Sequence, residues 1–149
     1  MNPFDLKAAL VARHAQHVVL IHFPIALFLT AVAFDLWAVW KKNSALAAVA
    51  YYNVVAAAVA ALPAVATGLL AWQLQLGGKT PRGNLRLHLA LALISSSAMW
   101  LVWHFHVRAR RKFQPELTGL RLGFELGTAV LIALTGHLGG FLSGVNGPV

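Results

Sequence analysis

The chain has 149 residues, of which 59% are hydrophobic and 11% are charged, and it contains no cysteine. A soluble domain has about 25% charged residues, so this composition indicates an integral membrane protein without room for a sizeable soluble domain. The lack of cysteine excludes disulfides, thiolate catalysis, cysteine-ligated iron–sulfur clusters and covalently attached c-type haem. The net charge of +8 comes from basic residues in short loops between apolar segments, which favours lipid headgroups over nucleic acid as partners.

Residues 1–13 are predicted to form a short interfacial helix, and the first membrane span is predicted at residues 18–40. His17 and His22 lie at the start of this span, and Asp35 lies near its other end. Polar groups inside hydrocarbon are unfavourable unless they are paired, so each of the three is a candidate functional residue. The proline two residues after His22 leaves one backbone carbonyl without its helical donor, so that another donor can bind there.

The second span is predicted at residues 45–76, and it ends in a glycine-rich loop at residues 77–84. Ala60, Ala64 and Gly68 recur every four residues along this span. Small residues at this spacing let a neighbouring helix approach closely, so they mark an expected packing surface. The spans do not repeat one another recognisably in sequence.

The third span is predicted at residues 85–107, and one face of it is expected to point into the protein. The stripe on that face consists of His88, Ala92, Ser95 and Met99, at the spacing of a bundle-facing helix. His104 and His106 lie near the far end of the span, beside a run of basic residues.

The fourth span is predicted at residues 117–142, and it carries a seam of glycines. The seam consists of Gly119, Gly123 and Gly127, where another helix is expected to pack. His137 lies about 40° from this seam on a helical projection and is expected to point toward that helix. Arg121 and Glu125 are four residues apart and are expected to form an ion pair.

Four spans with short connections predict an all-α, up-down-up-down antiparallel bundle, a single membrane domain over residues 1–149. Both termini then share one side with the loop at 77–84. The densest basic residues follow the first and third spans, on the other side. The orientation rule for basic residues places that side in the cytoplasm, and both termini on the periplasmic side of a bacterial inner membrane.

This topology gathers His17, His22, His88 and His137 at the outer end of the bundle, and it leaves three interpretations open. In the first, a b-type haem is bound with His22 and His88 as axial ligands and His137 as the alternate ligand. The propionate partners would be Arg13, Arg82 and Arg86. In the second, two to four of the imidazoles bind copper or zinc. In the third, the histidines bind no cofactor and join the helices by hydrogen bonds. Asp35 belongs to the opposite end, where a lysine or a basic residue of a neighbouring helix is its expected partner.

Several short motifs resemble the prokaryotic membrane family called domain of unknown function 2231, over residues 14–147 or so. The motifs are His17-x4-His22-Phe-Pro24, Gly68-Leu-Leu-Ala-Trp72, His88 and Gly136-His137-Leu-Gly-Gly140. The resemblance implies a four-helix inner-membrane domain, with Asp35 and the four outer histidines at the polar positions of the family. Some members are fused to Rieske or c-type cytochrome domains, which implies redox electron transfer. Ala71 and Phe141 stand where acidic residues are expected, which favours a structural role in this chain.

The leading expectation is therefore a small b-type cytochrome, or haem-carrying subunit, of a membrane redox complex. Membrane lipid, a cytochrome or Rieske protein, and quinone are its candidate partners. The alternative is a cofactor-free accessory subunit that packs against a larger respiratory or photosynthetic complex. The sequence shows no nucleotide-binding loop, nucleophile triad or paired carboxylates, so no self-contained catalytic motif points to a stand-alone enzyme.

Overall fold

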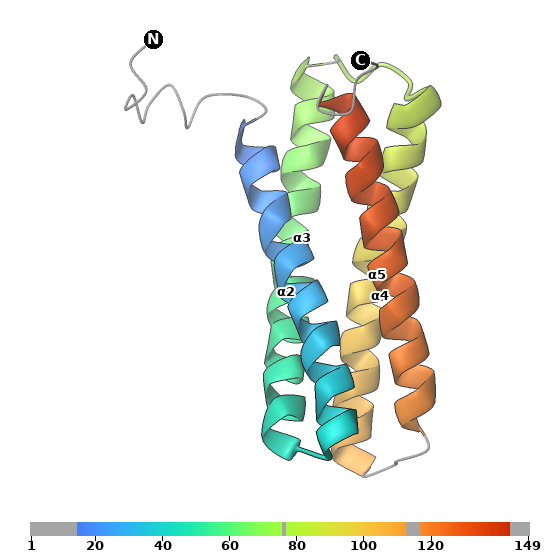
Figure 1. Ribbon diagram of the computed structural model, residues 1–149. Coiled ribbons are helices and arrows are strands. Elements are labelled where there is room, and N and C mark those ends of the chain that lie inside the picture. Colours follow the sequence, from blue (N-terminus) through green and yellow to red (C-terminus); the bar gives the residue numbers. More distant parts are fainter. Residues whose placement is uncertain (1–14, 76, 113–116, 144–149) are drawn as a thin grey trace.

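The computed structural model describes residues 15–75, 77–112 and 117–143 of the chain. They form four helices, α2 (Ala15–Lys41), α3 (Ser44–Gln75), α4 (Gly83–Lys112) and α5 (Leu117–Leu142). Each helix is long and apolar enough to cross a membrane. The helices run up-down-up-down side by side, so the start of α2 and the end of α5 share one end (Figure 1). The predicted all-α bundle is confirmed, whereas the predicted helix at 1–13 lies outside the described residues.

The helix bounds differ most from the prediction at the end of α4, which continues to Lys112 rather than ending at 107. Hydropathy marked the end of the apolar stretch, but it does not mark the end of the helix. Arginine and lysine are good helix formers, and their long stems let the charged heads leave the hydrocarbon. The helix therefore runs on through the basic residues to Lys112.

The connection between α2 and α3 has only two residues outside helices. Lys42 has a φ of 49°, and the backbone N–H of Asn43 donates to the carbonyl of Ala38 at 3.0 Å, which closes α2 with a Schellman motif. The side chain of Asn43 then accepts hydrogen bonds from the backbone N–H groups of Ala45, at 2.9 Å, and Leu46, at 3.3 Å. One residue pair thus ends one helix and starts the next, and the two helices are held as a tight hairpin.

The helices form a closed ring in which α2 and α4 each pack against both α3 and α5. The closest packing is between α2 and α3, because the buried face of α3 consists mostly of alanine. The largest apolar side chains of the core are those of Phe28, Val32, Val54, Met99, Val102 and Ile132. α2 and α4 are therefore diagonal to each other, with the core between them.

The α2–α3 hairpin and the α4–α5 hairpin bury equivalent positions, which lie 71 residues apart in the sequence. The buried pairs are Pro24/Ser95, Phe28/Met99, Ala31/Val102 and Asp35/His106 on α2 and α4, and Val54/Glu125, Ala57/Thr128 and Ala61/Ile132 on α3 and α5. Two hairpins that run in the same direction and bury the same positions are parallel structural repeats, related by an approximate twofold axis along the membrane normal. The repeat cannot be recognised in the amino-acid sequence, because the residues at equivalent positions differ in type.

The glycine seam of α5 does not pack as predicted. A Cβ atom built on Gly119, Gly123 or Gly127 would meet no atom within 4 Å, and the three glycines line an apolar groove on the outside of α4 and α5. The face of α5 that enters the bundle is instead the one with Glu125 and Ile132. His137 is correspondingly exposed rather than turned toward a packed helix. Spacing alone could not tell a lipid-facing glycine seam from a helix contact.

Candidate functional site

The buried charged groups of the described chain meet near one end of the bundle, called here the basic end because the α2–α3 connection with its lysines lies there. Asp35 stands six residues before the end of α2, and His106 stands six residues before the end of α4. At 1.5 Å per residue, both lie about 9 Å inside their helix ends. Arg121 and Glu125 reach the same level from the start of α5. These four residues are called the polar cluster.

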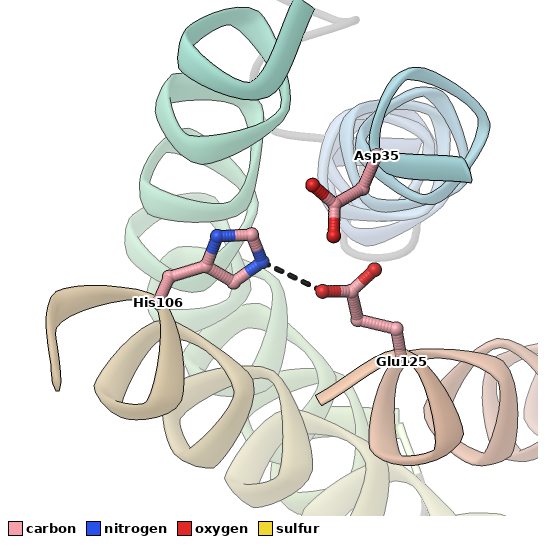
Figure 2. A group of neighbouring side chains, drawn as sticks. All are labelled: Asp35, His106 and Glu125. Atoms are coloured by element: carbon pink, nitrogen blue, oxygen red, sulfur yellow. Dashed lines mark hydrogen bonds and ion pairs between the residues drawn. The ribbon is translucent and has the colours of Figure 1, made fainter. Parts of the chain in front are cut away.

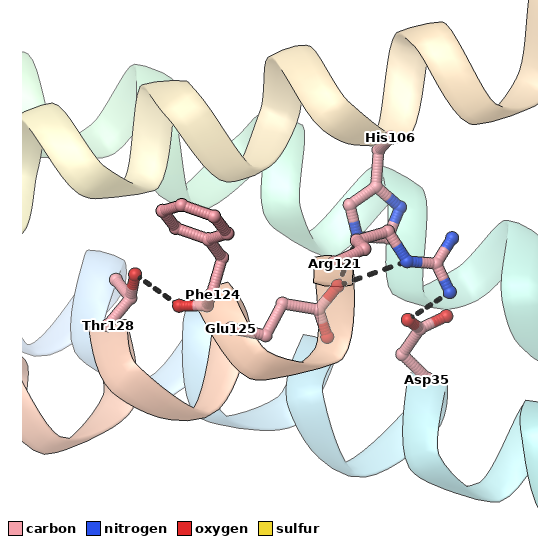
Figure 3. A network of polar contacts seen from close by, with 6 residues as sticks. All are labelled: Asp35, His106, Arg121, Phe124, Glu125 and Thr128. Atoms are coloured by element: carbon pink, nitrogen blue, oxygen red, sulfur yellow. Dashed lines mark hydrogen bonds and ion pairs between the residues drawn. The ribbon is translucent and has the colours of Figure 1, made fainter. Parts of the chain in front are cut away.

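Three contacts join the residues of the polar cluster (Figures 2 and 3). His106 Nε2 and Glu125 Oε1 share a hydrogen bond of 2.7 Å. Arg121 Nη2 donates to Asp35 Oδ2, and Arg121 Nε lies 3.4 Å from Glu125 Oε1 in an ion pair. The guanidinium therefore bridges the two carboxylates, and through them it connects α2, α4 and α5.

The polar cluster is shielded from its surroundings. Asp35 is 1% exposed, His106 2% and Glu125 0%, while the Arg121 side chain keeps 13% of its surface. Asp35 Oδ1 and Glu125 Oε2 are buried without a hydrogen-bond partner among the described residues. A buried acceptor without a donor destabilises the fold by about 1–3 kcal/mol, and more when it is charged. The arrangement is thus less favourable than a fully satisfied structural network.

The formal charges of the polar cluster do not cancel. Two carboxylates, one guanidinium and a neutral imidazole sum to one negative charge, and an unbalanced charge is strongly disfavoured in a low-dielectric interior. One bound proton makes the group neutral. It can lie in the short contact between His106 Nε2 and Glu125 Oε1, because both atoms can accept a proton. The same side chains could also hold a metal, because Asp35, His106 and Glu125 offer ligand atoms within 4.8 Å of one another. A divalent ion beside Arg121 would leave the group positive, so charge balance favours the proton.

The residues around the polar cluster differ on its two sides. Toward the basic end, the Tyr51 ring lies 6.3 Å from the His106 ring, and the Arg110 guanidinium stacks 4.3 Å over Tyr51. Toward the other end, the buried apolar side chains of Phe28, Met99 and Ile132 follow within about two helical turns. Polar and charged groups therefore border the cluster on the basic side, and a packed apolar layer closes it on the other.

The outer histidines are spread over separate contacts rather than gathered into one site. His17 Nδ1 bonds the carbonyl of Ala64 on α3, and His88 Nδ1 bonds the carbonyl of Thr135 on α5, both at 3.0 Å. His22 is exposed, and its Nδ1 bonds the carbonyl of Val18 on its own helix at 2.6 Å. The other members of the predicted site, His137, Arg82 and Arg86, are exposed at this same end, the histidine end.

Hydrogen bonds between helices, which the cofactor-free interpretation requires, are thus present at His17 and His88. No three imidazoles come together among the described histidines. Within 15–75, 77–112 and 117–143, three or more metal-ligand side chains come together at the polar cluster and nowhere else. A haem with His22 and His88 as axial ligands stays a prediction.

Sequence reasoning placed two of the cluster's contacts correctly. A basic residue of a neighbouring helix was among the expected partners of Asp35, and Arg121 of α5 fills that role. The expected pair of Arg121 and Glu125 is also present. The role of His106 was missed. Its signal was available, because the inward stripe of α4 reaches His106 when it is continued seven residues beyond Met99.

Together, the fold and the polar cluster define a class: all-α proteins that cross the membrane four times and bury an ionisable group near one end. The sequence model of the family described as predicted membrane protein DUF2231 matches residues 13–147. The chain therefore belongs to this family, as the motifs indicated. None of the curated proteins and none of the solved structures compared with the chain matches it.

Proposed function

We propose that this protein is a proton-binding membrane subunit, in which the polar cluster takes up and releases one proton through the basic end. The observation that carries the proposal is that two buried carboxylates, Asp35 and Glu125, share the single guanidinium of Arg121, while the His106 imidazole contacts Glu125. Ionisable groups inside a membrane are functional candidates by default, and proton relays are among their commonest uses.

A purely structural role explains this arrangement less well. Buried ion pairs contribute little net stability compared with apolar side chains of similar size. A structural network would also satisfy its acceptors, whereas one oxygen of Asp35 and one of Glu125 have no hydrogen-bond partner in the described part of the chain. Acceptors that are ready for a proton suit a group that changes its protonation state.

The packed layer of Phe28, Met99 and Ile132 argues against a proton channel through the whole bundle. The polar cluster exchanges its proton with one side only, the side on which Arg110 and the lysines of the α2–α3 connection lie. The rule for basic residues places that side in the cytoplasm of a bacterial inner membrane, with the histidine end toward the periplasm. The subunit thus loads a proton without conducting it.

Infrared difference spectroscopy of the protein in lipid discs, between neutral and alkaline pH, tests the proposal. Wild type should lose one proton, seen as a protonated carboxyl or an imidazolium band. Glu125→Gln makes the remaining charges cancel without a proton, so this signal should vanish. His104→Gln changes an exposed imidazole on the same helix as His106 but outside the polar cluster, and it serves as the matched control, with the wild-type signal retained. An identical difference spectrum for wild type and Glu125→Gln would overturn the proposal.

A further inference from the structure

The outer face of the α4–α5 hairpin carries a groove that no described part of the chain fills. The groove has a volume of about 480 Å³, and its lining includes Ala98 and Leu101 of α4 and the three glycines of the α5 seam. A Cβ atom built on any of these glycines would meet no atom within 4 Å. The lining extends along α5 from residue 119 to residue 131, which corresponds to about 18 Å of helix.

Packing inside the protein does not account for this groove. Glycine is among the least favourable residues in a helix interior, and here no neighbouring helix uses the space that the glycines leave. The position equivalent to Gly123 in the other hairpin is Tyr52, whose side chain is 64% exposed. The hollow therefore belongs to one hairpin only, and its occupant has to come from outside the described chain.

A cation lies at the mouth of the groove, toward the basic end. Arg108 follows Leu101 by seven residues on α4, which is two helical turns, so the two residues lie on the same face. Phe105 lies between them and contacts Phe124 of the groove, with ring centroids 4.9 Å apart, so this part of α4 is level with the lining of α5. Arg108 is exposed, and it forms no ion pair with residues that the structure describes. The groove thus combines an apolar surface with an unbalanced positive charge at one end.

We propose that the groove binds one anionic phospholipid, with an acyl chain along the glycine seam and the phosphate on Arg108. The hydrocarbon core of a bilayer is about 30 Å thick, so an acyl chain of one leaflet extends about 15 Å, close to the length of the groove. The guanidinium forms forked hydrogen bonds with phosphate oxygens, and its long stem lets it reach the headgroup level. An anionic headgroup balances this charge, whereas a zwitterionic headgroup brings its own cation.

A second copy of the chain fits the groove less well. A twofold contact uses the same surface on both subunits, so two copies joined through this groove would bring their Arg108 side chains to the same level. Like charges near the membrane repel each other, and the basic end already carries Arg110 and the lysines of the α2–α3 connection. A lipid phosphate meets the same cation with the opposite charge. Charge complementarity therefore selects the lipid.

Native mass spectrometry of the purified full-length protein in detergent tests the proposal, with dioleoyl phosphatidylglycerol and dioleoyl phosphatidylcholine as probes. Wild type should retain one phosphatidylglycerol molecule more tightly than phosphatidylcholine. Arg108→Gln removes one cation at the headgroup level, so it should weaken phosphatidylglycerol binding about fivefold and leave phosphatidylcholine binding unchanged. Gly123→Leu places a side chain in the groove and should weaken the binding of both lipids.

Two matched controls accompany these variants. Arg110→Gln removes a cation from the same end of α4, but one whose guanidinium stacks over Tyr51 instead of lying on the groove side. Tyr52→Leu changes the exposed position that is equivalent to Gly123. Both should bind phosphatidylglycerol like wild type, and circular dichroism verifies that each variant is folded.

Equal binding of the two lipids by wild type would overturn the proposal, as would unchanged phosphatidylglycerol binding in folded Arg108→Gln or Gly123→Leu. An equal loss in Arg110→Gln would also overturn it, because binding would then follow total charge rather than this site. A lipid-free dimer or a co-purified protein that dissociates in Gly123→Leu would assign the groove to another occupant and reject the lipid. Glu125→Gln should bind phosphatidylglycerol like wild type, so failure here is distinguishable from failure of the proposed proton site.

Discussion

At the scale of single residues, Arg121 is the side chain on which the polar cluster depends. It supplies the only positive charge that contacts Asp35 and Glu125 in the described residues. Arg121→Met leaves two buried carboxylates without a counter-charge, so the free energy of unfolding should fall by about 3–5 kcal/mol. Denaturation in mixed micelles, followed by circular dichroism, measures the change.

A double variant separates the lost ion pair from lost packing. Arg121→Met combined with Asp35→Leu removes the charge and one of its partners together, so it should recover much of the stability lost in the single variant. If the losses of stability in the two single variants simply add in the double variant, the ion pair with Asp35 is not the source of the stability that Arg121 contributes. Arg121→Lys should rescue only in part, because a point charge does not bridge two carboxylates as the guanidinium fork does.

At the scale of helices, two kinds of glycine can be told apart. Gly68→Ala places a methyl group 2.9 Å from the His17 ring, which must turn away and strain its bond to Ala64. A loss of about 1–3 kcal/mol is expected from such overpacking. Gly123→Ala has open space around it, so it should stabilise α5 by up to about 1 kcal/mol through helix propensity. Thermal unfolding of both variants beside wild type makes the comparison, and equal losses in the two would contradict it.

The elements and their order could be predicted from the sequence, because apolar length alone specifies a membrane helix. Which faces meet could not be predicted as well. Hydropathy does not show that the glycine seam of α5 is turned outward, or that His106 shares a level with Asp35. The repeat could not be recognised for a related reason. Asp35 is equivalent to His106, and Phe28 is equivalent to Met99, so burial is preserved at these positions while residue type is not. Which residues face one another depends on how the helices pack in the bundle. A repeat can be recognised in one sequence only when its equivalent residues are of the same type.

At the scale of the whole molecule, two chemically different ends are separated by one apolar core. The basic end holds a cluster with one negative charge to balance, and the histidine end holds imidazoles fixed by backbone carbonyls. The core residues between them, Phe28, Met99, Val102 and Ile132, are all buried. The packed core therefore separates the two sets of polar groups along the length of the bundle.

The orientation of these ends can be tested because the chain contains no cysteine. Thr80→Cys lies on the exposed α3–α4 connection, and Ser44→Cys lies at the exposed start of α3. If the basic residues set the topology, a membrane-impermeant maleimide should label Thr80→Cys on intact cells, and Ser44→Cys only after the inner membrane is opened. Wild type should remain unlabelled in both conditions. The reverse pattern would place the polar cluster near the outer surface, and its proton would then exchange with the periplasm rather than the cytoplasm.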